Sequence, residues 1–207
     1  MVLLKSNTGW LIIMDAAEAV IRPMKMGDLL LLDQIDPAFE SATYLELERS
    51  EGEGWPAFSF VERPFETSFV KEVGYRYDAE QLEQARYRLE HGDALMLVAQ
   101  VAERLVAVLE VEGESWRNTA LVWALFVDRA WRGRGLGHTL LGRAEAWAKK
   151  RKFRAAVLET QTNNVPAIRF YQRQGYHIAG FDTHFYTNRD VEQREVALFM
   201  YKALERR

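Results

Sequence analysis

The chain has 207 residues, of which 48% are hydrophobic and 28% charged, enough for one sizeable core and at most a second small one. Its 27 Lys and Arg against 30 Asp and Glu leave a net charge of -3, which argues against a nucleic-acid or membrane-surface protein. The absence of cysteine excludes disulfides, a Cys-based zinc site and a thiol nucleophile, and is compatible with the cytoplasm, where we expect the protein.

The N-terminal part is short and weakly patterned. Residues 1–18 are expected to be an extension, in which the apolar stretch Trp10–Met14 suits an edge strand rather than a signal peptide. Residues 19–203 are expected to form the main domain. No apolar run approaches the roughly 18 to 20 residues of a bilayer-spanning helix, so we expect no membrane segment.

The main domain is predicted to begin with a strand and a helix. Ala19–Met24 is predicted as a strand that leads into a helix over about Gly27–Asp36. From Pro37 to Tyr77 the periodicity is lost among Gly, Pro, Glu and aromatic residues. We interpret this stretch as a functional insertion or as short helices, because so long a structureless loop is unusual in a compact domain.

Regular patterning returns at Asp78, which suits the N-cap of a helix that ends at Gly92. Three strand-like runs follow, at Ala94–Val101, Leu105–Glu112 and Thr119–Asp128, with short polar connections typical of an antiparallel meander. The third run is apolar on both faces, which predicts a central position in the sheet.

The C-terminal half alternates between the two kinds of element. A helix is predicted over about Gly135–Lys152, a strand at Ala155–Thr160 and a second helix over about Asn164–Gln174. Strands near Tyr176–Tyr186 and Arg194–Tyr201 complete the chain. The fold class is therefore α/β, with helices packed on a mixed sheet.

A glycine-rich turn, Arg132-Gly133-Arg134-Gly135-Leu136-Gly137-His138-Thr139, separates the central strand from its helix. Glycines let successive amide N–H groups converge on an anion, and the helix N-terminus adds positive potential. A dinucleotide fingerprint would need glycine where His138 stands, and a triphosphate loop would need Gly-Lys-Ser/Thr. The turn is thus predicted to bind a phosphate group, with a ligand-free turn as the alternative.

Val127–Gly137 (VDRAWRGRGLG) resembles the acetyl-coenzyme A motif of the GNAT N-acetyltransferases, Arg/Gln-x-x-Gly-x-Gly/Ala, and the order of elements resembles that family too. Leu158–Asn188 (LETQTNNVPAIRFYQRQGYHIAGFDTHFYTN) resembles the streptothricin acetyltransferases within it. The resemblance implies the GNAT fold, a mixed, mostly antiparallel twisted sheet of about six or seven strands. It also implies a sheet splayed between the central strand and the next, where the cosubstrate enters.

The resemblance also implies how acetyl coenzyme A is held. In the family the central strand pairs with the pantetheine arm and the turn amides hold the pyrophosphate. Asn164 is by default a helix N-cap, and the family adds a contact with the pantetheine arm. The residues implied are Leu125, Phe126, Val127, Arg132, Gly133, Arg134, Gly135, Leu136, Gly137, His138, Thr139, Asn164 and Tyr171.

Acetyl transfer to an amine requires a group that removes the amine proton and a group that protonates the departing thiolate. Tyr171 matches the family's usual general acid, the alternative being a packed tyrosine. The central strand carries no acidic residue, and Glu159 on the next strand matches a general-base position found in some members. Glu159 could instead be a structural or substrate-binding carboxylate.

The resemblance implies that the acceptor is a primary amine of a small cationic molecule, a streptothricin-type antibiotic. A peptide or protein N-terminus and another small amine are the alternatives. The segment Asp36–Gly54 is acidic and either attracts a cation or is simply solvated, and Asp182 is the predicted acceptor contact. A sensor that binds acyl coenzyme A without turnover is the non-enzymatic alternative. The four dispersed histidines predict no metal site, and a homodimer stays open.

Overall fold

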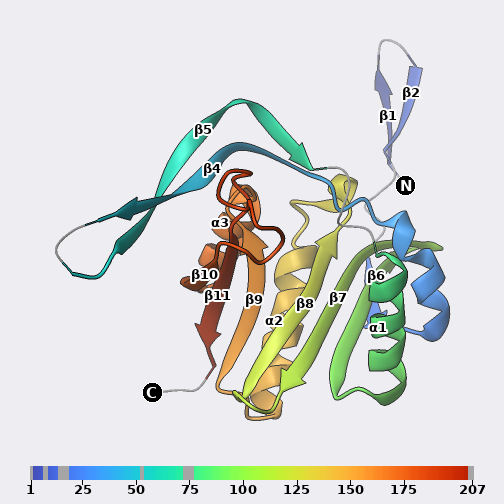
Figure 1. The fold of residues 1–207 in the computed structure, drawn as a ribbon. Helices are drawn as coiled ribbons and strands as arrows, with labels where there is room; N and C mark the ends of the chain where they lie inside the picture. The colour runs from blue at the N-terminus through green and yellow to red at the C-terminus, as the bar shows by residue number, and fades with distance from the viewer. Residues whose placement is uncertain (1, 7–8, 14–18, 52–53, 72–76, 205–207) are drawn as a thin grey trace.

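The computed structural model describes residues 2–6, 9–13, 19–51, 54–71 and 77–204. Seven strands form one mixed sheet in the order β10-β11-β9-β8-β7-β6-β3, in which only β8 and β9 run parallel (Figure 1). The strands are β3 (Val20–Pro23), β6 (Ala94–Val101), β7 (Arg104–Glu114), β8 (Thr119–Val127), β9 (Ala155–Gln161), β10 (His177–Asp182) and β11 (Ala197–Ala203). The predicted fold is confirmed, and β8 is the central strand as its two apolar faces indicated.

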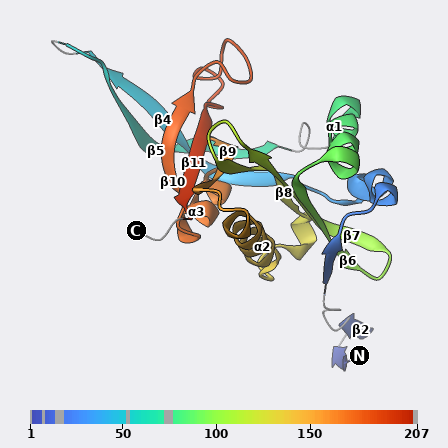
Figure 2. The same ribbon diagram turned by 90° about the horizontal axis from the view of Figure 1, so that it is seen from below.

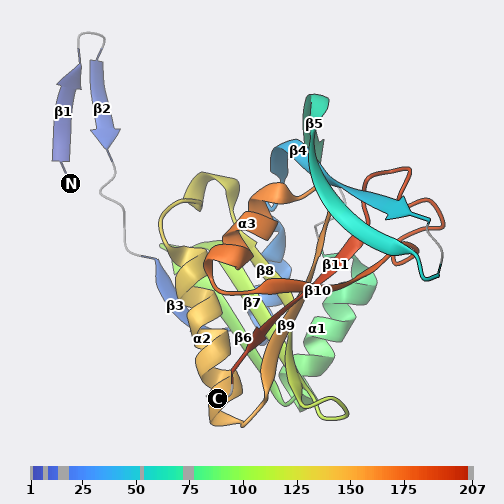
Figure 3. The same cartoon turned by 90° about the vertical axis from the view of Figure 1, so that its left-hand side faces the viewer.

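Helices cover both faces of this sheet. The α2 helix (Leu136–Lys150), which connects the parallel strands, lies on one face, and α1 (Ala79–His91) lies on the other (Figure 3). Side chains of a strand point alternately to the two faces. On β6, Leu97 therefore packs in the core beneath α2, whereas Met96 and Val98 pack in the core beneath α1.

The first two predicted helices are present but differ in type. The Asp78 carboxylate accepts the Gln81 amide at 2.8 Å, and the Gln81 side chain accepts the Asp78 amide, so α1 begins with a capping box. The predicted helix after β3 is a 3-10 helix, η1 (Met26–Gln34). Leu29 and Leu32 lie three residues apart, which places both on the same side of a three-residue turn, and both are buried.

The expectation of short helices over 37–77 is wrong for the described residues of this stretch. Most of it forms a long antiparallel hairpin of β4 (Phe39–Ser50) and β5 (Ala57–Lys71), which projects beyond the sheet (Figures 1 and 2). A register shift between Ser41 and Thr43 breaks the two-residue period, and the two strands pair only with each other, so much of the hairpin is exposed. Neither feature leaves a continuous apolar stripe in the sequence.

The two ends of the chain also differ in detail from expectation. β1 (Val2–Ser6) and β2 (Gly9–Ile13) pair with each other in a separate two-stranded sheet, and Met14 lies outside the described residues. β10 ends at Asp182, four residues before the predicted strand end, because residues 183–196 form a folded loop. No helix among the described residues is long and apolar enough to cross a membrane.

Candidate active site

The sheet opens between its two parallel strands. β8 and β9 pair from Thr119 opposite Ala155 only as far as Val122 opposite Leu158. Trp123 is an extra residue on β8, because Val122 and Ala124 face consecutive residues of β7. Such a bulge bends the strand and increases its twist, so the far half of β8 diverges from β9. The predicted splay is therefore present.

A cavity of about 480 Å³ occupies this opening. Its walls come from β8, the glycine-rich turn, the first turn of α2, the end of β9 and the α3 helix (Val165–Arg173). Most of the predicted site residues line it, namely Leu125, Phe126, Val127, Arg132, Gly133, Gly135, Leu136, Gly137, His138, Glu159, Asn164 and Tyr171. Arg134, Thr139 and Asp182 are not among the lining residues.

The glycine-rich turn presents free backbone amides to the cavity. Gly133 and Gly135 have φ of +75° and +82°, a left-handed conformation that side-chain-bearing residues rarely adopt. Gly135 is the N-cap of α2, and the Thr139 amide donates to its carbonyl at 3.0 Å as the first bond of the helix. The amides of 136–138 precede that bond and have no partner within the helix. They can therefore hold an anion such as a pyrophosphate.

The three predicted residues outside the lining have other contacts. The Arg134 guanidinium lies over the Trp131 ring, 4.4 Å from its centroid. The Thr139 hydroxyl donates to the Gly135 carbonyl at 3.1 Å, which uses its hydrogen within α2. Asp182 is exposed at the end of β10, where its carboxylate accepts the His184 amide at 2.8 Å.

Glu159 lies on β9 at the edge of the opening and lines the cavity. Burial raises its pKa to about 7, an effect that the Tyr186 hydroxyl and the positive charge of Lys71 oppose and the negative charge of Glu195 reinforces. The Tyr186 hydroxyl donates a short hydrogen bond to Glu159 Oε1. A carboxyl group with a pKa near neutral pH can both accept and return a proton under physiological conditions.

Tyr171 faces the same cavity from α3. Burial, and to a smaller extent the charge of Glu159, raise the pKa of its phenol well above the ordinary value. Among the described residues no hydrogen-bond partner of its hydroxyl is found, so the proton is available to a group in the cavity. Asn164 caps α3 through a 3.2 Å bond from the Ala167 amide, as predicted. It also lines the cavity, and its contact with the pantetheine arm stays a prediction.

The acidic segment 36–54 contributes little to the lining. Pro37 and Phe39 are its lining residues, and neither is acidic. Glu46 and Glu48 lie on the exposed hairpin, where Arg63 of β5 forms ion pairs with both at 2.9 Å and 2.7 Å. These two carboxylates are thus paired with a cation away from the cavity.

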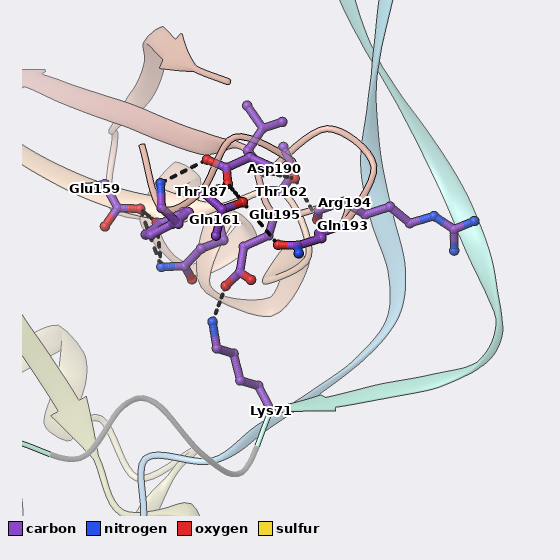
Figure 4. A network of polar contacts seen from close by, with 11 residues as sticks. Lys71, Glu159, Gln161, Thr162, Thr187, Asp190, Gln193, Arg194 and Glu195 are labelled. Atoms are coloured by element: carbon purple, nitrogen blue, oxygen red, sulfur yellow. Dashed lines mark hydrogen bonds and ion pairs between the residues drawn. The ribbon is translucent and has the colours of Figure 1, made fainter. Parts of the chain in front are cut away.

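Sequence reasoning missed two side chains next to Glu159. Gln161 is two residues further along β9, and Tyr186 comes from the loop 183–196. Figure 4 shows the polar network around Glu159 and Gln161. Both belong to the stretch that resembles the streptothricin acetyltransferases, so a signal was present. Nothing in the linear pattern placed the loop against β9.

Comparison with known proteins decides the family. Residues 55–176 match the model of the acetyltransferase (GNAT) family. The chain belongs to this family. Among the described residues of this GNAT protein there is no group of three or more His, Asp or Glu placed to hold a metal ion.

Several of the relatives are named for the acetylation of streptothricin or nourseothricin. The chain is 33% identical over 109 residues to the streptothricin acetyltransferase of Escherichia coli, which covers 53% of this chain and 62% of that protein. It thus spans less than two thirds of that relative's length. The crystal structure of nourseothricin acetyltransferase aligns with a TM-score of 0.73 and 25% identity, over 91% of this chain and 99% of that one. A Bacillus anthracis protein assigned as a streptothricin acetyltransferase, solved in complex with acetyl coenzyme A, aligns with a TM-score of 0.69 and 26% identity, over 89% and 99% of the chains.

Proposed function

We propose that this GNAT protein transfers the acetyl group of acetyl coenzyme A to a primary amine of a small cationic antibiotic of the streptothricin type, at an amino group of its β-lysine arm. The observation that carries the proposal is the opening between β8 and β9, which has free amides at one end and an acid–base pair, Glu159 and Tyr171, in its wall. The relatives named for streptothricin and nourseothricin acetylation support the acceptor.

The residues present fit acetyl coenzyme A. The amides of 136–138 suit its pyrophosphate, and beyond Val122 the backbone of β8 is no longer paired with β9 and can pair with the amide groups of the pantetheine arm. Arg132 lines the same end of the cavity and adds positive charge. When bound, acetyl coenzyme A supplies an activated acetyl thioester, and no metal is needed for that chemistry.

Two side chains perform the proton transfers in this proposal. The ionised carboxylate of Glu159, directly or through a water molecule, takes the proton from the acceptor nitrogen as that nitrogen forms a bond to the acetyl carbon. The carbon–sulfur bond breaks, and Tyr171 donates its phenolic proton to the departing thiolate. The raised pKa of Tyr171 keeps its phenol protonated at neutral pH, so the proton is in place when the thiolate departs.

Two alternatives have distinct signatures. A peptide N-terminus or another small amine would use the same acid and base, so only the acceptor distinguishes it from an antibiotic. An acyl-coenzyme A sensor would bind the cosubstrate without turnover. Glu159 in the cavity wall favours an enzyme, because it is not among the residues implied to hold the cosubstrate.

The test is thiol release from acetyl coenzyme A by purified protein with streptothricin, aminoglycosides, polyamines and short peptides, each product being analysed by mass spectrometry. Acetylation of streptothricin at its β-lysine arm, and of no other compound at a similar rate, is expected. Preference for another amine would refute the proposed acceptor but not the proposed acetyl transfer. Cosubstrate binding without any product would favour the sensor.

A further inference from the structure

The side chains around Glu159 form an ordered chain of hydrogen bonds. Gln161 Nε2 donates to Tyr186 Oη at 2.9 Å, and the Tyr186 hydroxyl in turn bonds to Glu159 Oε1. An amide nitrogen can only donate, so the tyrosine oxygen accepts from Gln161 and its single hydrogen is directed to Glu159. Gln161 Nε2 also reaches Glu159 Oε1 at 3.4 Å. The carboxyl group thus receives donors on the oxygen that faces the loop.

The loop that carries Tyr186 is held by a buried carboxylate. Asp190 is fully buried and accepts the amides of Tyr186 and Thr187 at 3.0 Å and 2.7 Å, together with the Thr187 hydroxyl at 2.7 Å (Figure 4). These donors hold the pKa of Asp190 below its ordinary value although burial acts in the opposite direction. The position of Tyr186 is therefore fixed by the hydrogen bond from its backbone amide to Asp190.

The same loop is attached to the end of β9, which carries Glu159. The Thr162 hydroxyl donates to the Arg194 carbonyl at 2.9 Å and accepts the Val196 amide at 3.0 Å. An ion pair between Lys71 of β5 and Glu195 connects the hairpin to the loop (Figure 4). The loop, the hairpin and β9 thus meet around one carboxyl group.

From this geometry we propose that Tyr186 is a positioning residue for the acetyl transfer, which with Gln161 orients the Glu159 carboxyl group and stabilises its ionised form so that it accepts the proton of the acceptor amine. The proposal rests on the proposed function, since it assigns Glu159 as the base. Tyr186 acts through Glu159 and exchanges no proton with the substrate.

Among the described residues, the charged and titratable groups around Glu159 are Lys71, Glu195, Tyr171 and Tyr186. Lys71 favours the ionised carboxylate, and Glu195 disfavours it. A hydrogen bond donated to a carboxylate stabilises its charged form, so the loss of the Tyr186 hydroxyl alone raises the pKa of Glu159 further. A bond of this kind typically shifts the pKa by about one pH unit.

The first experiment needs no turnover. The carboxyl carbon of Glu159 is followed by ¹³C NMR as a function of pH in wild-type protein and in Tyr186→Phe, and Glu159→Gln identifies the signal. We expect the wild-type midpoint near 7 and a midpoint about one unit higher in Tyr186→Phe. Gln161→Leu should shift it less, in the same direction. Tyr87→Phe, an exposed tyrosine on α1, is the matched control and should leave the midpoint unchanged.

The second experiment compares kcat/KM of wild-type protein and Tyr186→Phe for one acceptor between pH 6 and 9. The ionisation of the acceptor is common to both proteins and cancels in the ratio. We expect the variant to be about tenfold slower at pH 6.5 and to approach the wild-type rate at pH 9.

Two results would overturn the proposal: equal midpoints in the two proteins, or a shifted midpoint with a rate ratio that does not change with pH. If the wild-type protein acetylates no amine, the proposed function fails, and the NMR titration still decides whether Tyr186 controls the ionisation of Glu159.

Discussion

The raised pKa of Glu159 predicts that the site carboxylate destabilises the fold, and Glu159→Gln tests this. The glutamine keeps an oxygen that can accept from Tyr186 and removes the ionisation. In wild-type protein the carboxyl group is neutral up to a pH of about 7, whereas in the unfolded chain it ionises at about its ordinary pKa of 4.5. Between these values the unfolded state binds fewer protons than the folded state.

The sign and size of the effect follow from this difference. Stability falls with rising pH wherever the folded state binds more protons, so Glu159 lowers wild-type stability between about pH 4.5 and 7. The pKa difference corresponds to a decrease of up to about 3 kcal/mol in the free energy of unfolding, and the decrease is complete above pH 7. The Glu159→Gln variant does not lose this stability. The difference between its free energy of unfolding and that of wild type should therefore rise from pH 4 to a plateau above pH 7.

Urea unfolding at half-unit intervals from pH 4 to 8.5 measures the effect. Glu103→Gln, which removes an exposed carboxylate in the β6–β7 turn, is the control and should follow the wild-type pH dependence. A constant difference between Glu159→Gln and wild type across this range would show that burial does not perturb Glu159. The same variant should lose about 10² to 10⁴-fold in turnover, as expected for removal of a general base.

Two further predictions concern the cavity, and a third concerns a buried ion pair between α1 and β7. Tyr171→Phe should bind acetyl coenzyme A normally by calorimetry and lose at least about 10²-fold in kcat, and wild-type turnover would remove Tyr171 from the acid role. Gly135→Ala places a side chain at φ of +82°, so it should weaken acetyl coenzyme A binding and lower the free energy of unfolding by about 1 kcal/mol. Gly142→Ala, in open space within α2, is the control and should do neither. Equal affinities of the two variants for acetyl coenzyme A would contradict the assignment of the turn. Arg88→Met removes the guanidinium 2.5 Å from the fully buried carboxylate of Glu110 and should lower the unfolding free energy by about 3 kcal/mol, and an unchanged urea midpoint would refute that estimate.

Local interactions allowed several parts of the site to be predicted from the sequence. The glycine pattern of the turn reflects backbone conformations that only glycine adopts easily, and the Asp78 and Asn164 caps act on amides three residues away. The two apolar faces of β8 predicted its central position because both sides of a central strand are covered. The resemblance to the family then led to Glu159 and Tyr171, which the structure brings to one cavity.

Contacts between distant segments decided the rest. The hairpin β4–β5 was missed because its strands pair with each other across a register shift and leave no continuous apolar stripe. The contact of Tyr186 with Glu159 joins residues 27 positions apart through a loop that a buried Asp190 shapes. The raised pKa of Glu159 likewise arises from the surfaces that surround it. A residue pattern encodes the conformation of a few neighbouring residues, whereas burial and long-range pairing exist only after the chain has folded.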